Sequence, residues 1–426
     1  MKVKFFKEKN YNLHYLSVDS FRHSSFSIVF TSSFEPKKAV AFAFLTDILT
    51  EASTNYPSRK YIEKFLDNNY MYNFYGSYIK VGKSIQTYVS CDYIDEKYVD
   101  CENYLENIYK FIFDIISNPL TENGGFSKSI FESVKNRHIK GLKSLDGNNK
   151  FIANDRALKL YSSNPEISFH MKDMFEYIQN LTPQELYKEY LELIKETSID
   201  IIISGNDDPN VIAKLVKKYF PFDDTKPYKK YEEVTLTEHR LFPKKKVDKS
   251  FYNQSCIYLI YNIDNPTMYE REFVSKYYLD IISYVGLNSK LDQSLREKNQ
   301  LCYSVGASVW DRNSILVISS TVKVGKEKQA IKLMKQAVKD MTNNISKEEF
   351  TGAYYSEQRG LKGVTDSMGA MGRIYTNQYF SGFSSYEEIL KKIKEVKVSE
   401  IYSYAKKIKL NTVYVLKGDN NERTED

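Results

Sequence analysis

The sequence predicts an α+β protein with two homologous domains, each an antiparallel-rich β-sheet packed against helices. Strand-like runs are followed by long helical runs, and the strands come as hairpins instead of in strict β–α–β alternation. Both halves also end alike, with a helix that leads into an apolar strand and then a glycine. These glycines, Gly205 and Gly418, lie half a chain length apart. That spacing indicates an internal duplication.

The first half is expected to alternate between a few strands and longer helices. Apolar side chains recur at helix spacing in 37–51, and Pro57 and Ser58 open the next helix. A Tyr-rich stretch broken near 81–83 predicts a β-hairpin. The other expected elements are strands at 13–18, 25–30 and 198–206, and helices at 96–116, 127–143 and 182–196.

The second half reads in a similar order. A charged, proline-containing stretch precedes it, so we place a linker at 221–246, between an N-terminal domain (1–220) and a C-terminal domain (247–426). The expected elements are strands at 254–263 and 411–419, a hairpin at 303–322, and helices at 268–286, 289–300, 327–341, 347–379 and 397–408.

Composition excludes several classes of protein. The chain has 426 residues, 42% of them hydrophobic, which is enough for two buried cores. A net charge of +6 is modest, and solvated lysines explain it better than recruitment of an acidic partner. Four cysteines without a CxxC pair favour a reducing compartment. No signal-type or membrane-length apolar run occurs, so a cytoplasmic protein without membrane contact is expected.

Chemical motifs are mostly absent. The segment GSYIKVGKS has five residues between its first glycine and GKS, whereas a phosphate-binding loop needs four, so a hairpin turn is favoured. The Tyr-rich hairpin is better explained as a half-buried strand than as a base-stacking surface, and no nucleic acid is expected. No two histidines are spaced i, i+4, so no helical zinc site is expected. The histidines are His14, His23, His138, His170 and His239.

One segment, LREKNQLCYSVGA at 295–307, carries Arg296 and Tyr303 seven residues apart. A guanidinium and a phenol can both donate to a carbonyl oxygen as charge builds on it. The segment resembles the C-terminal-domain signature of the pitrilysin/insulysin-type metallopeptidase superfamily, which includes mitochondrial processing peptidase. The resemblance implies that Arg296 and Tyr303 bind substrate.

That superfamily also has a first-domain helix bearing His-x-x-Glu-His. The run KAVAFAFLTDILTEASTNYPSRKYIEKFLDNN resembles this region, and alignment on Thr54 puts Phe44, Asp47 and Ile48 at the three motif positions. The third zinc ligand would fall at Val134, with Glu132 close by. With both imidazoles missing, no metal or other cofactor is expected in this chain.

The whole chain resembles the inactive YfmF-like bacterial members, which are described as associated with elongation factor P modification. The resemblance implies a non-catalytic subunit of a heterodimeric zinc peptidase, half of a clamshell that helps enclose and position a peptide. Zinc and HxxEH would be supplied only by the partner. Two alternatives stay open: a peptide-binding or regulatory module associated with elongation factor P modification, without a role in proteolysis, and an independent hydrolase with an unrecognised site.

Overall fold

The structure, a computed structural model, describes residues 2–222, 240–284 and 288–419 and divides into two compact units. Both units combine helices with an antiparallel-rich sheet, which confirms the predicted α+β class. Most of the predicted linker lies outside the described residues. The units are not continuous in sequence: unit 1 is Met1–Lys143, Met171–Glu232 and Thr365–Ser381, and unit 2 is Ser144–His170, Glu233–Val364 and Gly382–Asp426.

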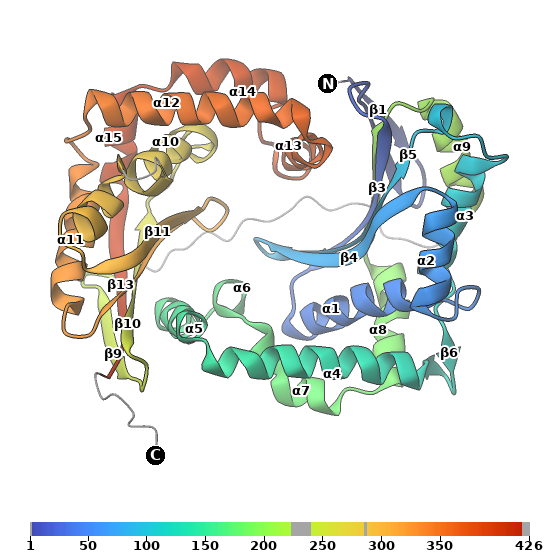
Figure 1. Ribbon diagram of the computed structural model, residues 1–426, viewed down its shortest axis with the longest axis horizontal. Coiled ribbons are helices and arrows are strands. Elements are labelled where there is room, and N and C mark those ends of the chain that lie inside the picture. The colour runs from blue at the N-terminus through green and yellow to red at the C-terminus, as the bar shows by residue number, and fades with distance from the viewer. Residues whose placement is uncertain (1, 223–239, 285–287, 420–426) are drawn as a thin grey trace. The chain divides into compact units, whose positions relative to one another are not determined.

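The sheet of unit 1 has six strands in the order β1-β2-β8-β3-β5-β4 (Figure 1). Only β2 and β8 are parallel. The predicted hairpin is present, because β4 and β5 are joined by the two residues Gly82 and Lys83. The strands are β1 (Lys2–Lys7), β2 (Asn12–Ser17), β3 (His23–Ser33), β4 (Met71–Val81), β5 (Ser84–Ile94) and β8 (Ser198–Gly205).

The sheet of unit 2 repeats this arrangement with one strand fewer. Its order is β11-β12-β10-β13-β9, and only β13 and β9 are parallel. Strand for strand it matches β4-β5-β3-β8-β2, so the predicted duplication is visible in the topology. The strands are β9 (Lys244–Lys249), β10 (Gln254–Ile263), β11 (Cys302–Trp310), β12 (Ile315–Lys323) and β13 (Ile408–Lys417).

The two glycines that signalled the duplication occupy equivalent places. A Cβ atom on Gly205 would lie 1.9 Å from Oγ of Ser24, at the start of β3. A Cβ atom on Gly418 would lie 2.6 Å from the carbonyl oxygen of Gln254, at the start of β10. Each glycine therefore allows the last strand of its unit to approach the neighbouring antiparallel strand closely.

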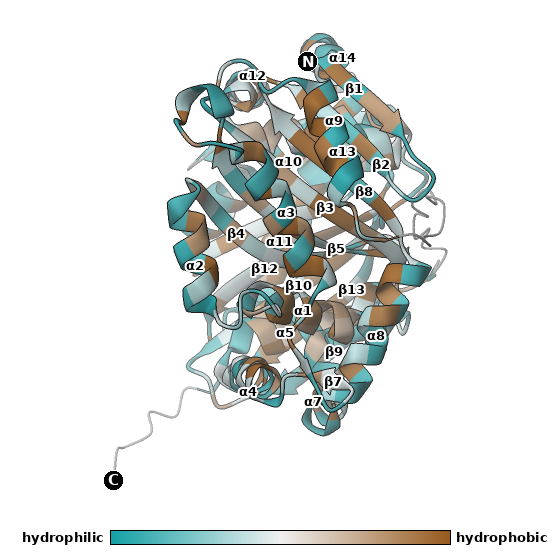
Figure 2. Cartoon of the chain, turned by 90° about the vertical axis from the view of Figure 1, so that its right-hand side faces the viewer, coloured by the Kyte–Doolittle hydropathy of each residue, from teal (hydrophilic) through white to brown (hydrophobic). Residues whose placement is uncertain are grey.

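Helices cover the sheets, and the central strands such as β3 and β8 are coloured hydrophobic in Figure 2. In unit 1 these are α1 (Pro36–Glu51), α2 (Arg59–Asn68), α3 (Tyr104–Ser117), α4 (Lys128–Ser144), α7 (Phe175–Asn180), α8 (Pro183–Glu196), α9 (Pro209–Tyr219) and α13 (Met368–Ser381). In unit 2 they are α5 (Asn149–Tyr161), α6 (Pro165–Ser168), α10 (Ser275–Leu279), α11 (Glu327–Asp340), α12 (Lys347–Lys362), α14 (Tyr386–Lys392) and α15 (Val398–Lys406). None of the helices in the described residues is long and apolar enough to cross a membrane.

Helix α5 belongs to the first half of the chain but packs on the sheet of unit 2. Ala153, Ala157 and Tyr161 are buried against strands β10, β12 and β13. The Tyr161 hydroxyl donates to Oδ1 of Asn262 at 2.6 Å. Arg156 forms an ion pair with Asp248 of β9 at 3.3 Å. The helix therefore completes one face of this sheet.

Helix α13 makes the reciprocal exchange, since it comes from the second half and packs on the sheet of unit 1. The Tyr375 hydroxyl lies 2.6 Å from Nδ1 of His14 on β2, and Nε2 of His14 lies 2.9 Å from Oδ1 of Asp200 on β8. His14 and Asp200 are fully buried. Both ring nitrogens of His14 therefore have a hydrogen-bond partner inside the protein. Hydrogen bonds that link Asp200, His14 and Tyr375 thus attach α13 to the sheet.

Three helix predictions differ from the structure. The predicted helix at 96–116 is interrupted, because Asn103 has a φ of 55° and α3 begins after it. The predicted helix at 347–379 is two helices, α12 and α13, separated by Gly363–Asp366 and Ser367. The interruption lets α13 leave unit 2 for unit 1. The predicted helix at 268–286 contains π-helical turns on both sides of α10, and its last two residues lie outside the described part.

Replacing Tyr375 with phenylalanine is expected to destabilise the protein by about 1–3 kcal/mol, because it leaves Nδ1 of buried His14 without its hydrogen-bond partner. Urea unfolding of the full chain measures the effect. The matched control is Tyr355→Phe on α12, whose side chain is 60% exposed and whose loss of a hydroxyl should cost less than about 0.5 kcal/mol. Equal stability of the two variants would contradict the proposed attachment of α13.

Candidate functional site

Helix α1 carries the three positions that align with the zinc-binding motif. It begins at Pro36, and nearly all its residues from Ala39 onward are buried, as expected of a helix that is apolar on every side. Phe44, Asp47 and Ile48 are spaced i, i+3, i+4 and so share one face. Phe44 is fully buried and Ile48 is 3% exposed, whereas the Asp47 side chain is 34% exposed.

An apolar contact with α4 occupies the position of the first motif histidine. The Phe44 ring stacks on the His138 ring with centroids 4.3 Å apart and planes 14° from parallel. Phe131, two helical turns before His138, also lies beside Phe44 at 6.4 Å. Val134, aligned with the third zinc ligand, is fully buried and one turn from His138. Glu132 is two residues away, which is about 160° around the helix from Val134.

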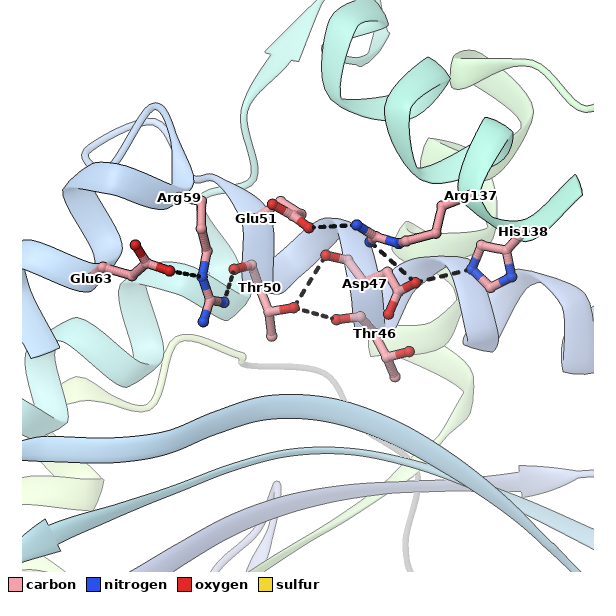
Figure 3. Close-up of polar contacts among 8 residues, drawn as sticks. All are labelled: Thr46, Asp47, Thr50, Glu51, Arg59, Glu63, Arg137 and His138. Carbon is pink, nitrogen blue, oxygen red and sulfur yellow. Dashed lines mark hydrogen bonds and ion pairs between the residues drawn. The ribbon is translucent and has the colours of Figure 1, made fainter. Parts of the chain in front are cut away.

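A polar network continues from Asp47, as Figure 3 shows. The Asp47 carboxylate is 3.1 Å from Nε2 of His138 and 3.3 Å from Nη2 of Arg137. Arg137 also donates to Glu51, one turn along α1, at 3.0 Å. The carboxylate that aligns with the family's general base therefore joins α1 to α4.

Electrostatics favour the ionised form of this carboxylate. Burial opposes ionisation, but the hydrogen bonds and positive charges of His138 and Arg137 outweigh it and hold the pKa of Asp47 below its usual 3.8. The Arg137 pKa is raised: partial burial alone would lower it, but Glu51 and Asp47 outweigh that effect. Asp47 is thus an ion-pair partner at neutral pH, since a general base needs a pKa nearer to the working pH.

These residues do not fit a catalytic zinc ion. Phe44, Ile48 and Val134 have no donor atoms, and Asp47 and His138 are bonded to each other. A zinc site needs three protein ligands directed at one point. Across the described residues, no group of three or more His, Cys, Asp or Glu side chains has a metal-binding arrangement.

Strand β4 passes directly beside this part of α1. Gly76 lies so close to the helix that a Cβ atom there would be 2.5 Å from the carbonyl oxygen of Thr46. Burial and the charge of Asp47 both raise the pKa of Tyr78 on the same strand. β4 ends the sheet order of unit 1, so one side of its backbone has no strand partner in the described chain. The exposed large side chains on it are Tyr72, Tyr75, Tyr78 and Ile79.

The other predicted site residues, Arg296 and Tyr303, belong to unit 2. Arg296 is in the π-helical turn Asp292–Glu297; its side chain is 45% exposed and 3.5 Å from Glu297. Tyr303 is the second residue of β11, where the register with β12 shifts, so it is the extra residue of a β-bulge. The Tyr303 side chain lies outside the described part. A short turn joins the two residues, with Leu301 N donating to Leu295 O at 2.9 Å.

The residues that contact Phe44 and Asp47 are not among the site residues expected from the sequence. His138 is expected there only as a histidine without a second one at i, i+4, and Arg137 and Glu51 carry no expectation. A signal was present, because His138 follows Val134 by one helical turn and therefore faces α1 if Val134 does. Gly76 was read only as part of a turn motif, although glycine inside a strand often marks close backbone approach.

Known proteins share this architecture. The family model described as the peptidase M16 inactive domain matches residues 180–354. The probable inactive metalloprotease YmfF of Bacillus subtilis is 20% identical over 415 residues, covering 95% of each chain. A conserved protein from Enterococcus faecalis has a similar fold, with a TM-score of 0.90, 19% identity and 99% of both chains covered. A peptidase M16 inactive domain from Pseudomonas fluorescens also has a similar fold, with a TM-score of 0.76 and 13% identity. The match covers 98% of this chain and 99% of that domain's chain.

Replacing Asp47 with asparagine is expected to lower stability at pH 7 by about 0.5–1.5 kcal/mol, because His138 and Arg137 lose a charged acceptor. Asp47 has a lowered pKa when folded, so its contribution is present above about pH 4. It disappears as the pH falls through the folded pKa. Thermal unfolding of both proteins between pH 3 and 7 tests this, with exposed Asp67→Asn as control. A constant difference across that range would show that the ion pair is unimportant.

Proposed function

We propose that this chain, a non-catalytic member of the peptidase M16 family, acts as a subunit that positions a peptide for a homologous, HxxEH-bearing zinc peptidase. The partner would supply the zinc ion, its histidine ligands and the general base. This chain would supply binding surface. The proposal is based on a contrast between helix α1, which lacks the histidines of the zinc-binding motif, and strand β4, which has an open edge.

The observation that carries the proposal is the contrast between α1 and the strand beside it. The former metal position on α1 is closed by the Phe44–His138 stack and the Asp47 ion pairs. The adjoining strand β4 still has an open edge and exposed tyrosines. An open strand edge can bind an extended peptide through main-chain hydrogen bonds, with side chains contributing selectivity. Loss of the catalytic function beside a binding edge suits a substrate-positioning role.

Arg296 and Tyr303 are the second part of the proposal. Arg296 is exposed, and the bulge at Tyr303 interrupts regular pairing in β11, as bulges near functional sites often do. A guanidinium can donate two hydrogen bonds to peptide carbonyl oxygens, and a phenol can donate one. We assign both residues to substrate binding. We propose that they act together with the partner's catalytic residues.

The partner assignment is tested by purifying the HxxEH-bearing homologue from the same organism, alone and with this chain, and measuring cleavage of a fluorogenic peptide library. We expect cleavage to need both chains, to stop with a zinc chelator, and zinc to be found with the partner alone. Arg296→Ala should reduce kcat/KM by about tenfold, since a charged hydrogen bond contributes about 1.5–3 kcal/mol.

The matched control is Lys298→Ala, which removes an exposed cation two residues further along. It should leave kcat/KM within about twofold. If the partner cleaves peptides equally well without this chain, the subunit role is wrong. If the complex is active but Arg296→Ala and Tyr303→Phe change nothing, only the assignment of these two residues fails.

Gly76→Ala tests the binding edge on this chain directly. The added methyl group would collide with the α1 backbone at Thr46, so β4 must shift, at a cost of about 1–3 kcal/mol. We expect weaker binding of a labelled extended peptide, measured by fluorescence anisotropy. Gly141→Ala on α4 is the control, because nothing lies within 4 Å of its added atom. Undiminished peptide binding by a folded Gly76→Ala variant would place the binding surface elsewhere.

A further inference from the structure

The sheet of unit 2 has an open edge at β9. This strand ends the sheet order and pairs only with β13 among the described strands. Five of its six residues are exposed. We call the outer side of Lys244–Lys249, together with Leu241, Phe242 and Phe251, the β9 edge surface.

The internal duplication shows what can fill this edge. β9 corresponds to β2, because each is the parallel neighbour of the last strand of its sheet. In unit 1 the outer side of β2 is covered by β1, which pairs with it in antiparallel register from Lys2↔Ser17 to Lys7↔Asn12. Nothing in the described part of unit 2 takes the place of β1. One more antiparallel strand would give the two sheets the same number of strands.

Apolar side chains gather around this edge to an unusual degree. Leu241 is 97% exposed, Phe242 83%, Phe251 69% and Val247 61%. These are the four largest exposed fractions among the large hydrophobic side chains of the described residues. Clustered exposed apolar side chains are characteristic of protein-binding surfaces, whereas scattered ones are normal. The clustering indicates that another polypeptide covers the edge.

The charged side chains of β9 indicate which kind of polypeptide segment could bind along it. Alternate residues point to opposite faces, so lysines occur on both: Lys244 and Lys246 on one, Lys245 and Lys249 on the other. The acid within the strand, Asp248, is already bonded to Tyr414, Arg156 and Lys246. A second copy of β9, paired antiparallel along its full length, would place Lys244 opposite Lys249 at both ends, and directly opposed like charges destabilise strand pairs.

We propose that the β9 edge surface binds an extended, acidic segment of a partner protein as an added antiparallel strand. Glutamate or aspartate side chains of that segment would pair with the lysines on either face. Apolar side chains would cover Val247 and the aromatic residues at its ends. This site is separate from the peptide edge on β4 and does not depend on a role in proteolysis.

The probe is a fluorescein-labelled seven-residue peptide in which glutamate and valine alternate along each face of the extended strand, titrated with the full chain and followed by anisotropy. We expect saturable binding and increased protection of β9 amides from hydrogen exchange. Lys245→Glu combined with Lys249→Glu should weaken binding at least about tenfold, because two attractive cross-strand pairs become repulsive. The control, Lys140→Glu with Lys143→Glu on exposed positions of α4, makes the same change in net charge.

Two further peptides separate strand addition from simple charge attraction. One has lysine in place of glutamate, and the other has alternate amides methylated so that it cannot form a ladder. Both should bind at least about tenfold more weakly than the parent. The proposal is overturned if the parent does not bind, if the methylated peptide binds as well, or if a folded Lys245→Glu, Lys249→Glu variant keeps full affinity.

Discussion

The constraint on which this structure depends is the burial of β8. All eight of its residues are buried. The neighbouring strands β2 and β3 cover its two edges, so its two faces must be covered by other elements. A strand of this kind needs packing partners above and below the sheet. On one face helices of the first half, such as α8, contact the sheet, and α13 of the second half contacts β8 as well. The packing of α13, a helix of the second half, on the sheet of unit 1 follows from this need.

The class of fold was predictable because helices and strands are determined largely by sequence patterns that extend over a few residues. Alternation of apolar residues, the turn at Gly82 and the capping box of Thr182 and Glu185 each act over a few residues. The repeated helix–strand–glycine ending also pointed correctly to two similar sheets. The exchange of α5 and α13 was not predictable in this way. It depends on contacts such as His14 with Tyr375, which are more than 350 residues apart in sequence and leave no periodic signal.

In the candidate site, too, local features could be predicted from the sequence and long-range contacts could not. The sequence directed attention to Phe44, Asp47 and Ile48 through the resemblance to a motif, and the structure places all three on one helix, α1. The contacts of these positions could not be predicted, because they depend on how α4 presents His138 and Arg137 to α1. Apolar stacking and an ion-pair network join the two helices at the positions that align with the motif.

The reciprocal exchange also affects how the chain becomes folded as it is made. Domains of many proteins form one after another while the ribosome is still adding residues. Here the sheet of unit 1 lacks α13 until the chain has been made as far as Ser381, and the sheet of unit 2 lacks β13, which pairs with β10 and β9, until the chain has been made as far as Lys417. Unit 1 therefore lacks α13 until most of unit 2 has been synthesised, and apolar surface of its sheet stays uncovered until then.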